Sequence, residues 1–162
     1  MPKKEMDSHH AVKVTVSAQP FDQKAINEQI ATRVLGLTLQ TRPDGRQYWA
    51  QSDRPDTLFI TAEDWNPCVD TSPYFLPQNQ WMLVMERMVE LGFRIHIGLG
   101  YTLPKDWETK HPQVYQSNHF MCEIKRSRHP GNSIICYGSS LAEAVCLAAL
   151  AAINEFGGCE QG

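Results

Sequence analysis

Histidine is the residue type of this chain best suited to binding a metal ion, and the spacing of the histidines decides which metal sites are possible. His96 and His119 both fall at alternating positions that predict β-strands, so two neighbouring strands would bring their rings toward a shared metal ion or phosphate. A catalytic metal usually needs three protein ligands, and the chain contains neither an HExxH motif nor a cysteine pair of zinc-site spacing. The sequence therefore favours solvent-facing roles for both histidines and predicts no metal site.

Five cysteines are the next group with possible chemistry. Their number is odd and no two of them form a CxxC pair, which argues against a disulfide framework and against a zinc knuckle. Cys122, Cys136 and Cys146 lie in apolar surroundings, where a free cysteine behaves as a small hydrophobic residue. This usage predicts a reduced, cytoplasmic protein.

A basic segment is the strongest local charge feature. Residues 125–129 read KRSRH, and Lys125, Arg126, Arg128 and His129 precede a Pro-Gly pair, which predicts the tip of a β-hairpin. Such a tip can bind phosphate or an acidic protein surface. The alternative is a solvated turn whose charges protect a sheet edge from aggregation.

Two segments rich in aromatic residues are the other candidates for binding. One contains Trp65, Tyr74 and Phe75, and the other contains Tyr101 and Trp107. Tyr and Trp are common at binding surfaces and also stack on nucleobases. We expect Trp65 and Phe75 to pack on the core, whereas Tyr101 and Trp107, which are flanked by charged residues, suit binding and packing equally and are kept as binding candidates.

Nucleophilic catalysis finds little support in the sequence. Ser139 and Ser140 follow a glycine at a predicted strand-to-helix turn, but the pattern is not GxSxG, and Ser140 fits the N-cap of a helix. Asp64 and Asp70 share one loop with no fixed geometry. No dinucleotide or Walker motif is present, so we predict no catalytic residues, no cofactor and a non-enzymatic role.

Composition places these residues in one small domain. The chain has 162 residues, 42% of them hydrophobic and 20% charged, with a net charge of −3, which makes it a poor candidate for a DNA-coating protein. No apolar run approaches the length of a membrane span, and residues 1–10 lack the features of a secretory signal. We expect an N-terminal tail or edge strand at 1–20, one α+β domain at 21–157 and a C-terminal tail at 158–162.

Helical periodicity predicts three helices that would position the candidate residues, at 21–36, at 78–92 and from 140 to about 156. The second helix places Val84, Met85 and Met88 on a single apolar face. In the third, Ser140 and Glu143 fit a capping box.

Alternating apolar residues predict strands at 93–97, 119–124 and 133–137, with a turn at 129–132, and two shorter strands at 48–49 and 58–61. The segment 64–77 has three prolines and is predicted to be a loop. The fold class is therefore α+β, a mainly antiparallel sheet packed between helices as in an α/β/α sandwich.

These elements resemble a known family. The run from Asp70 to Met88, DTSPYFLPQNQWMLVMERM, leads a loop into an amphipathic helix, and the chain closes on SLAEAVCLAALAAI at 140–153. Together with an opening helix that ends in Val34-Leu35-Gly36, this pattern is similar to the phage ABA-sandwich domain family over residues 22–156. The resemblance implies a sheet between helical layers and a phage or prophage origin. The family offers no established catalytic residues to carry over.

Three functions remain open at this stage. The first is a non-catalytic, phage-derived interaction protein that binds a bacterial host protein and inhibits an antiviral defence such as a CRISPR effector. The second is a binding protein that sequesters a small ligand such as a nucleotide signal, for which the basic tip and the aromatic loops would serve. The third is a metal-dependent hydrolase built on His96 and His119. Nucleic acid and a second copy of the chain are further partners compatible with the sequence, and a membrane is not.

Overall fold

Three α-helices, one π-helical turn and seven strands form the part of the chain that the computed structural model describes, namely residues 12–16, 22–52, 54–69, 80–99, 120–126 and 129–157. The helical segments are α2 (Gln23–Gln29), η1 (Ile30–Val34), α3 (Trp81–Glu90) and α6 (Leu141–Phe156). The strands are β1 (Val12–Val16), β2 (Leu37–Thr41), β3 (Gln47–Gln51), β4 (Arg54–Thr61), β5 (Phe93–Leu99), β6 (Phe120–Arg126) and β7 (His129–Gly138). None of the helices described is long and apolar enough to cross a lipid bilayer.

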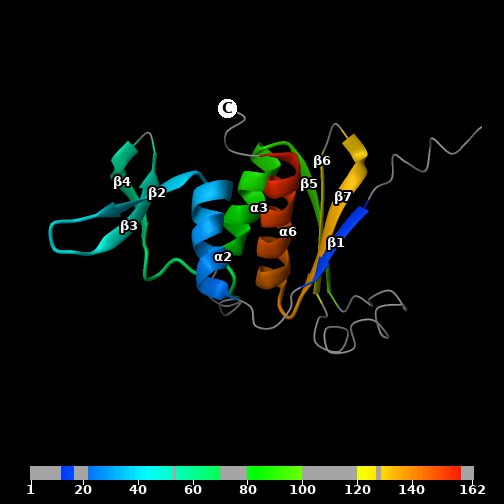
Figure 1. Ribbon diagram of the computed structural model, residues 1–162, viewed down its shortest axis with the longest axis horizontal. Coiled ribbons are helices and arrows are strands. Elements are labelled where there is room, and N and C mark those ends of the chain that lie inside the picture. Colours follow the sequence, from blue (N-terminus) through cyan, green and yellow to red (C-terminus); the bar gives the residue numbers. More distant parts are fainter. Residues whose placement is uncertain are drawn as a thin grey trace, which may run out of the picture.

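The large sheet has the strand order β1-β7-β6-β5 (Figure 1). Strands β5, β6 and β7 are antiparallel neighbours, and β1 lies parallel to β7, with Val12 opposite Ser133. The alternating valines near the N-terminus therefore form an edge strand, one of the two outcomes expected for residues 1–20. The α+β class and the mainly antiparallel sheet are confirmed.

The turn between β6 and β7 differs from the prediction. We expected it at 129–132, but β7 begins at His129, which pairs with Arg126, so the predicted position is wrong. The register shifts between Lys125, which faces Ser133, and Arg126. Pro130 and Gly131 therefore lie in an irregular part of β7, and strands tolerate both residue types at bulges.

The small sheet is an antiparallel meander of β2, β3 and β4. The predicted strands at 48–49 and 58–61 are parts of β3 and β4, whereas β2 was not predicted. Residues 43–45 form the turn between β2 and β3, and Gly45 adopts a φ of 89° that few other residues would accept. Figure 1 shows the helices between this sheet and the large sheet, so the described helices cover one face of the large sheet.

The first helix changes its winding at its centre. Asp22 caps the helix by accepting a hydrogen bond from the Ala25 backbone N–H at 3.1 Å. From Ile30 the chain follows a π-helical turn, closed by a bond of 3.0 Å from the Leu35 N–H to the Ile30 carbonyl. Gly36, at which the helix was predicted to end, follows with a φ of 69°, in the left-handed conformation.

Helix α6 begins with half of the expected capping box. The Glu143 N–H donates to the Ser140 hydroxyl at 3.1 Å, which confirms Ser140 as the N-cap. The Glu143 carboxylate, however, accepts from the backbone N–H and hydroxyl of Ser139, at 3.3 and 3.2 Å, rather than from the Ser140 N–H. A side chain at Gly138 would lie 2.8 Å from the Ala144 nitrogen, so the start of this helix requires a glycine in β7.

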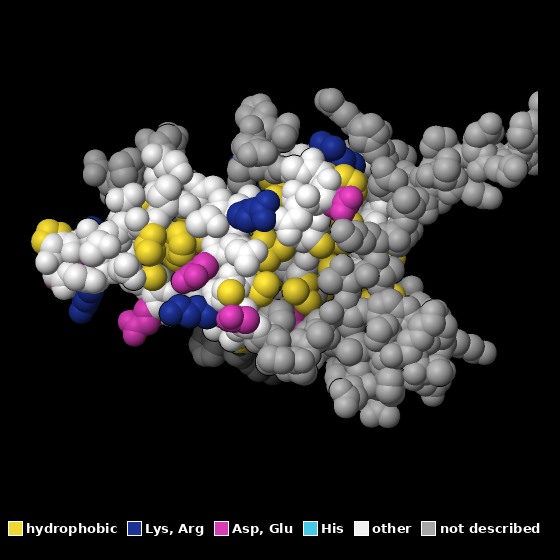
Figure 2. Space-filling view, viewed as in Figure 1, with side chains coloured by type: hydrophobic (Ala, Val, Ile, Leu, Met, Phe, Trp, Pro, Cys, Tyr) yellow, Lys and Arg dark blue, Asp and Glu magenta, His cyan; other side chains and the backbone are white. Residues whose placement is uncertain are grey.

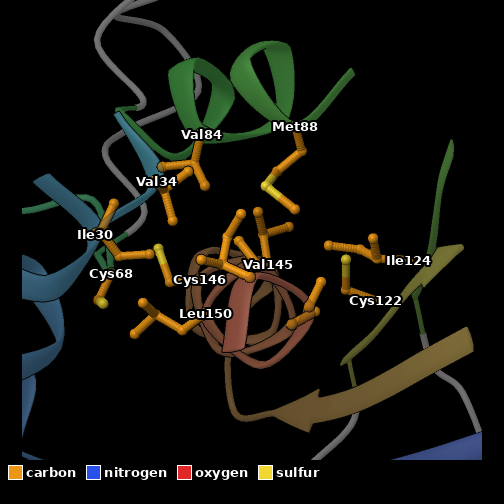
Figure 3. Close-up of a cluster of buried hydrophobic side chains, with 14 of the residues drawn as sticks. Ile30, Val34, Cys68, Val84, Met88, Cys122, Ile124, Val145, Cys146 and Leu150 are labelled. Carbon is orange, nitrogen blue, oxygen red and sulfur yellow. The ribbon is translucent and has the colours of Figure 1, made fainter. Parts of the chain in front are cut away.

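The core surrounds α6. Figure 3 shows Val84 and Met88 of α3 pointing toward Val145 and Cys146 of α6, with Cys122 and Ile124 of the large sheet on another side. Val84 and Met88 are fully buried, as their spacing predicted, whereas Met85 is half-buried at the margin of the core. Leu37 and Trp49 connect the small sheet to the same core. Helical and strand periodicity therefore identified most of the packing surfaces.

Candidate interaction site at the basic end of the large sheet

Strand pairing creates a pair of cations at one end of the large sheet. Arg94 of β5 lies directly opposite Lys125 of β6 in the antiparallel register. Residues that are opposite in such a register project from the same face of a sheet, with Cβ atoms about 5 Å apart. Arg94 comes from another strand, so the basic segment at 125–129 alone does not predict that Arg94 lies beside Lys125.

One carboxylate partly neutralises this end of the sheet. Glu123 Oε2 lies 3.8 Å from the Lys125 ammonium, and Glu123 Oε1 lies 3.7 Å from His96 Nδ1. Arg94 has no ion pair with another residue of the described part of the chain. His96 thus contacts a neighbouring acid, and the solvent-facing role expected for it agrees with its largely exposed side chain.

Arg126 lies on the other face of the sheet. Its guanidinium carbon is 5.7 Å from the centre of the Phe156 ring at the C-terminal end of α6. The Phe156 ring in turn lies 6.1 Å from that of Phe93. Cations are favoured at helix C-termini and over aromatic faces, so Arg126 covers the edge of the core rather than joining Lys125.

The remaining predicted site residues are placed only in part. His129 begins β7 and pairs with Arg126 through the backbone. Arg128, Tyr101, Trp107 and His119 lie outside the described residues, as do Tyr74 and Phe75. Figure 2 shows basic side chains at the end of the large sheet where β6 and β7 turn. The basic tip and the aromatic loop therefore stay predictions, and Arg94 is the residue that sequence reasoning missed.

The edge of the sheet beside Arg94 is open in the part of the chain that is described. Strand β5 is the last strand in the order β1-β7-β6-β5, and no other described strand pairs with its outer side. Ile97 on β5 is 43% exposed, and Val89 on the adjoining helix α3 is 59% exposed. An edge strand with basic side chains on one face and exposed apolar side chains toward the other is suited to accept another strand.

Burial controls the chemistry of the cysteines on these strands. Cys122 and Cys136 face each other across β6 and β7, and both are fully buried, as is Cys146. Cys68 is also buried, and none of these four cysteines forms a disulfide. Burial raises the pKa of the Cys122 thiol far above its ordinary value, with smaller contributions from Cys136 and Glu123. These thiols are therefore packing groups, in agreement with the prediction for Cys122, Cys136 and Cys146.

Trp65 confirms the packing role expected for it. It is 4% exposed, and its indole N–H donates to the Asn27 backbone carbonyl at 2.7 Å. Within the described ranges, no group of three or more His, Cys, Asp or Glu side chains could hold a metal ion.

Comparisons with known proteins identify a similar solved structure but no family for this chain. No family model matches the chain, and no curated protein matches it. A 2.0 Å crystal structure of a phage protein from Bacillus cereus ATCC 14579 is similar, with a TM-score of 0.44 and 14% sequence identity, over 85% of this chain and 92% of that chain.

Proposed function

We propose that this chain is a non-catalytic interaction protein that binds an extended acidic segment of another protein along the outer edge of β5. The observation that carries the proposal is the cationic pair of Arg94 and Lys125 beside an open edge strand. The resemblance to phage ABA-sandwich proteins supports a bacterial host protein as the partner, and inhibition of an antiviral defence as the purpose.

The chemistry of the edge specifies what would bind there. A strand that pairs with β5 gains backbone hydrogen bonds, and its side chains alternate between the two faces of the sheet. Side chains on the outer face would meet Arg94 and His96, and those on the opposite face would meet Ile97. The preferred segment therefore alternates acidic and aliphatic residues.

The cationic pair also provides a reason for binding. Like charges directly opposite each other in a sheet are unfavourable, on the order of a few tenths of a kcal/mol to 1 kcal/mol. Glu123 is shared between Lys125 and His96, which leaves Arg94 without a carboxylate among the described residues. An acidic side chain on an added strand would supply one and would remove the repulsion.

The test compares three forms of the protein as baits in a lysate of bacterial cells, with mass spectrometry of what each captures. The first is the wild type, the second is Arg94→Glu with Lys125→Glu, and the third is Arg33→Glu with Arg42→Glu. The third form has the same change of net charge at two exposed residues away from β5. We expect a protein that the wild type and the third form capture and the second form loses.

Salt provides an independent check on the same proposal. Capture that depends on exposed charges should decline as the salt concentration rises. Circular dichroism and urea unfolding of each form establish that the substitutions leave the fold intact. A partner captured equally by all three forms at low salt would show that β5 is not the binding edge.

A further inference from the structure

His96 lies on the same face of the large sheet as the cationic pair of Arg94 and Lys125. Core residues of β5 alternate with Arg94 and His96, which therefore project from the face opposite to the helices (Figure 1). In the antiparallel register, Arg94 lies opposite Lys125, and His96 lies opposite Glu123. The four polar side chains thus form two adjacent cross-strand pairs beside the open edge of β5.

Protonation of His96 changes the net charge of these four side chains. Histidine is the side chain that ordinarily gains and loses its proton between about pH 5 and 8. While the imidazole is neutral, the cations of Arg94 and Lys125 and the carboxylate of Glu123 leave one net positive charge. A protonated imidazole raises this to two. An acidic segment at the edge of β5 therefore meets twice the net charge once His96 is protonated.

The position of His96 lets it respond to the solvent and to a bound segment. Its side chain is 68% exposed, so both can reach the ring. Glu123 Oε1 lies 3.7 Å from Nδ1 of His96, and Glu123 Oε2 lies 3.8 Å from the Lys125 ammonium, so one carboxylate is shared by two bases. A protonated imidazole donates from both ring nitrogens. One nitrogen can therefore face Glu123 while the other donates to a carboxylate on an added strand.

The charged groups around His96 act in opposite directions. Among the described residues of β5 and β6, Arg94, Lys125 and Glu123 face it, and on the next strand Ile135, an apolar residue, lies opposite Glu123. The two cations oppose protonation of the ring, and the carboxylate favours it. An acidic segment adds a second carboxylate and so favours the protonated form.

We infer that His96 makes the edge of β5 a pH-dependent binding site, with higher affinity for an acidic segment when the imidazole is protonated. The inference rests on the function proposed above, since it concerns the same edge and the same class of partner. A ligand that binds the protonated form more tightly also promotes uptake of the proton, because the two equilibria are linked. Affinity therefore rises as the pH falls from 8.0 to 5.5.

The test measures the affinity of the whole protein for the synthetic peptide acetyl-Asp-Val-Asp-Val-Asp-Val-amide by calorimetry at pH 8.0 and pH 5.5. Aspartate, whose ordinary pKa is about 3.9, stays ionised at both, so the charge of the peptide remains nearly constant. An exposed ion pair changes affinity by about two- to fivefold, and the wild type should bind more tightly at pH 5.5 by that factor. The matched peptide with asparagine in place of aspartate should show no such gain.

Two variants of His96 separate its proton from the charge of the rest of the protein. The chain has six histidines, so its overall charge rises at low pH in every form. His96→Gln cannot be protonated and should lose most of the pH dependence. His96→Lys has a permanent charge and should bind at pH 8.0 about as tightly as the wild type binds at pH 5.5. The control His9→Gln, at a histidine to which no role is assigned, should behave as the wild type.

NMR spectroscopy of the His96 ring provides a second measurement. Its ring proton signals, identified by their absence from the spectrum of His96→Gln, should titrate at a higher pH with the peptide bound than without it. Equal pH dependence of the wild type and His96→Gln, or a titration that the bound peptide does not move, would overturn the inference and leave the proposed function standing. If neither the wild type nor His96→Lys binds the peptide at either pH, the proposed function is wrong, and this inference fails with it.

Discussion

Truncation of Met88 tests the central packing of the molecule. Met88 of α3 is fully buried and points toward α6, so Met88→Ala leaves a space between the two helices (Figure 3). The change removes three heavy atoms, and the transfer free energy of about 0.8 kcal/mol for each methylene-sized group gives a loss of about 2.4 kcal/mol. The unfilled cavity adds to this, so the expected cost is about 2–5 kcal/mol.

Two neighbours on the same helix serve as internal standards. Met85 is half-buried, so Met85→Ala should cost less than Met88→Ala, and Val89 is 59% exposed, so Val89→Ala should change stability by about 0.5 kcal/mol or less. Alanine favours the helix more than the residue it replaces in all three variants, and this gain is larger for Val89→Ala than for the two methionine variants.

Urea unfolding followed by circular dichroism measures these differences. At an unchanged slope, a lower midpoint reports lost stability, and the melting temperature of Met88→Ala should fall by roughly 5–20 °C. If Met88→Ala and Val89→Ala unfold at the same urea concentration, Met88 is not packed between α3 and α6 and the description of the core is wrong.

Three further predictions concern the strands and helix α6. Because burial raises the pKa of Cys122, the unfolded chain loses this proton at a lower pH than the folded chain, so stability should fall as the pH rises above 9.0, and urea midpoints should show a smaller fall for Cys122→Ala. Ser140→Ala should cost about 1 kcal/mol by removing the cap of α6, and an unchanged thermal midpoint would contradict that role. Gly138→Ala should destabilise the protein by more than Ser140→Ala, since its Cβ would lie 2.8 Å from the Ala144 nitrogen, and equal or higher thermal stability would disprove the close contact.

Local patterns in the sequence predicted the elements because those patterns arise from burial on one face. The spacing of Val84 and Met88 in α3, and the alternation of Cys122 and Ile124 in β6, both correspond to fully buried positions. The sequence did not reveal the π-helical turn at 30–34, because its apolar residues fit an ordinary α-helix equally well. Strand β2 was missed although Leu37 and Leu39 alternate with polar residues, since it follows the first helix directly.

The candidate sites depend on contacts between distant segments, which explains why the sequence predicted them only in part. The basic segment at 125–129 was visible, but Arg94 joins Lys125 only through the register of β5 and β6. Lys125 and Arg126 lie on opposite faces of the sheet, because consecutive residues of a strand project from opposite faces. Likewise, Asn27 and Asn66 are 39 residues apart, and their side chains form a hydrogen bond only after α2 packs against the segment at 61–66.

The parallel pairing of β1 with β7 has a consequence for how the protein is made on the ribosome. Val12 pairs with Ser133, which lies 121 residues further along the chain. At roughly 5–20 residues per second, about 6–24 s pass between the synthesis of the two strands. During that interval β1 has no partner, whereas β6 and β7 are synthesised close together and can pair as soon as both emerge. β1 can therefore pair only after β7 has been synthesised, whereas the two strands of the hairpin can pair with each other as they emerge.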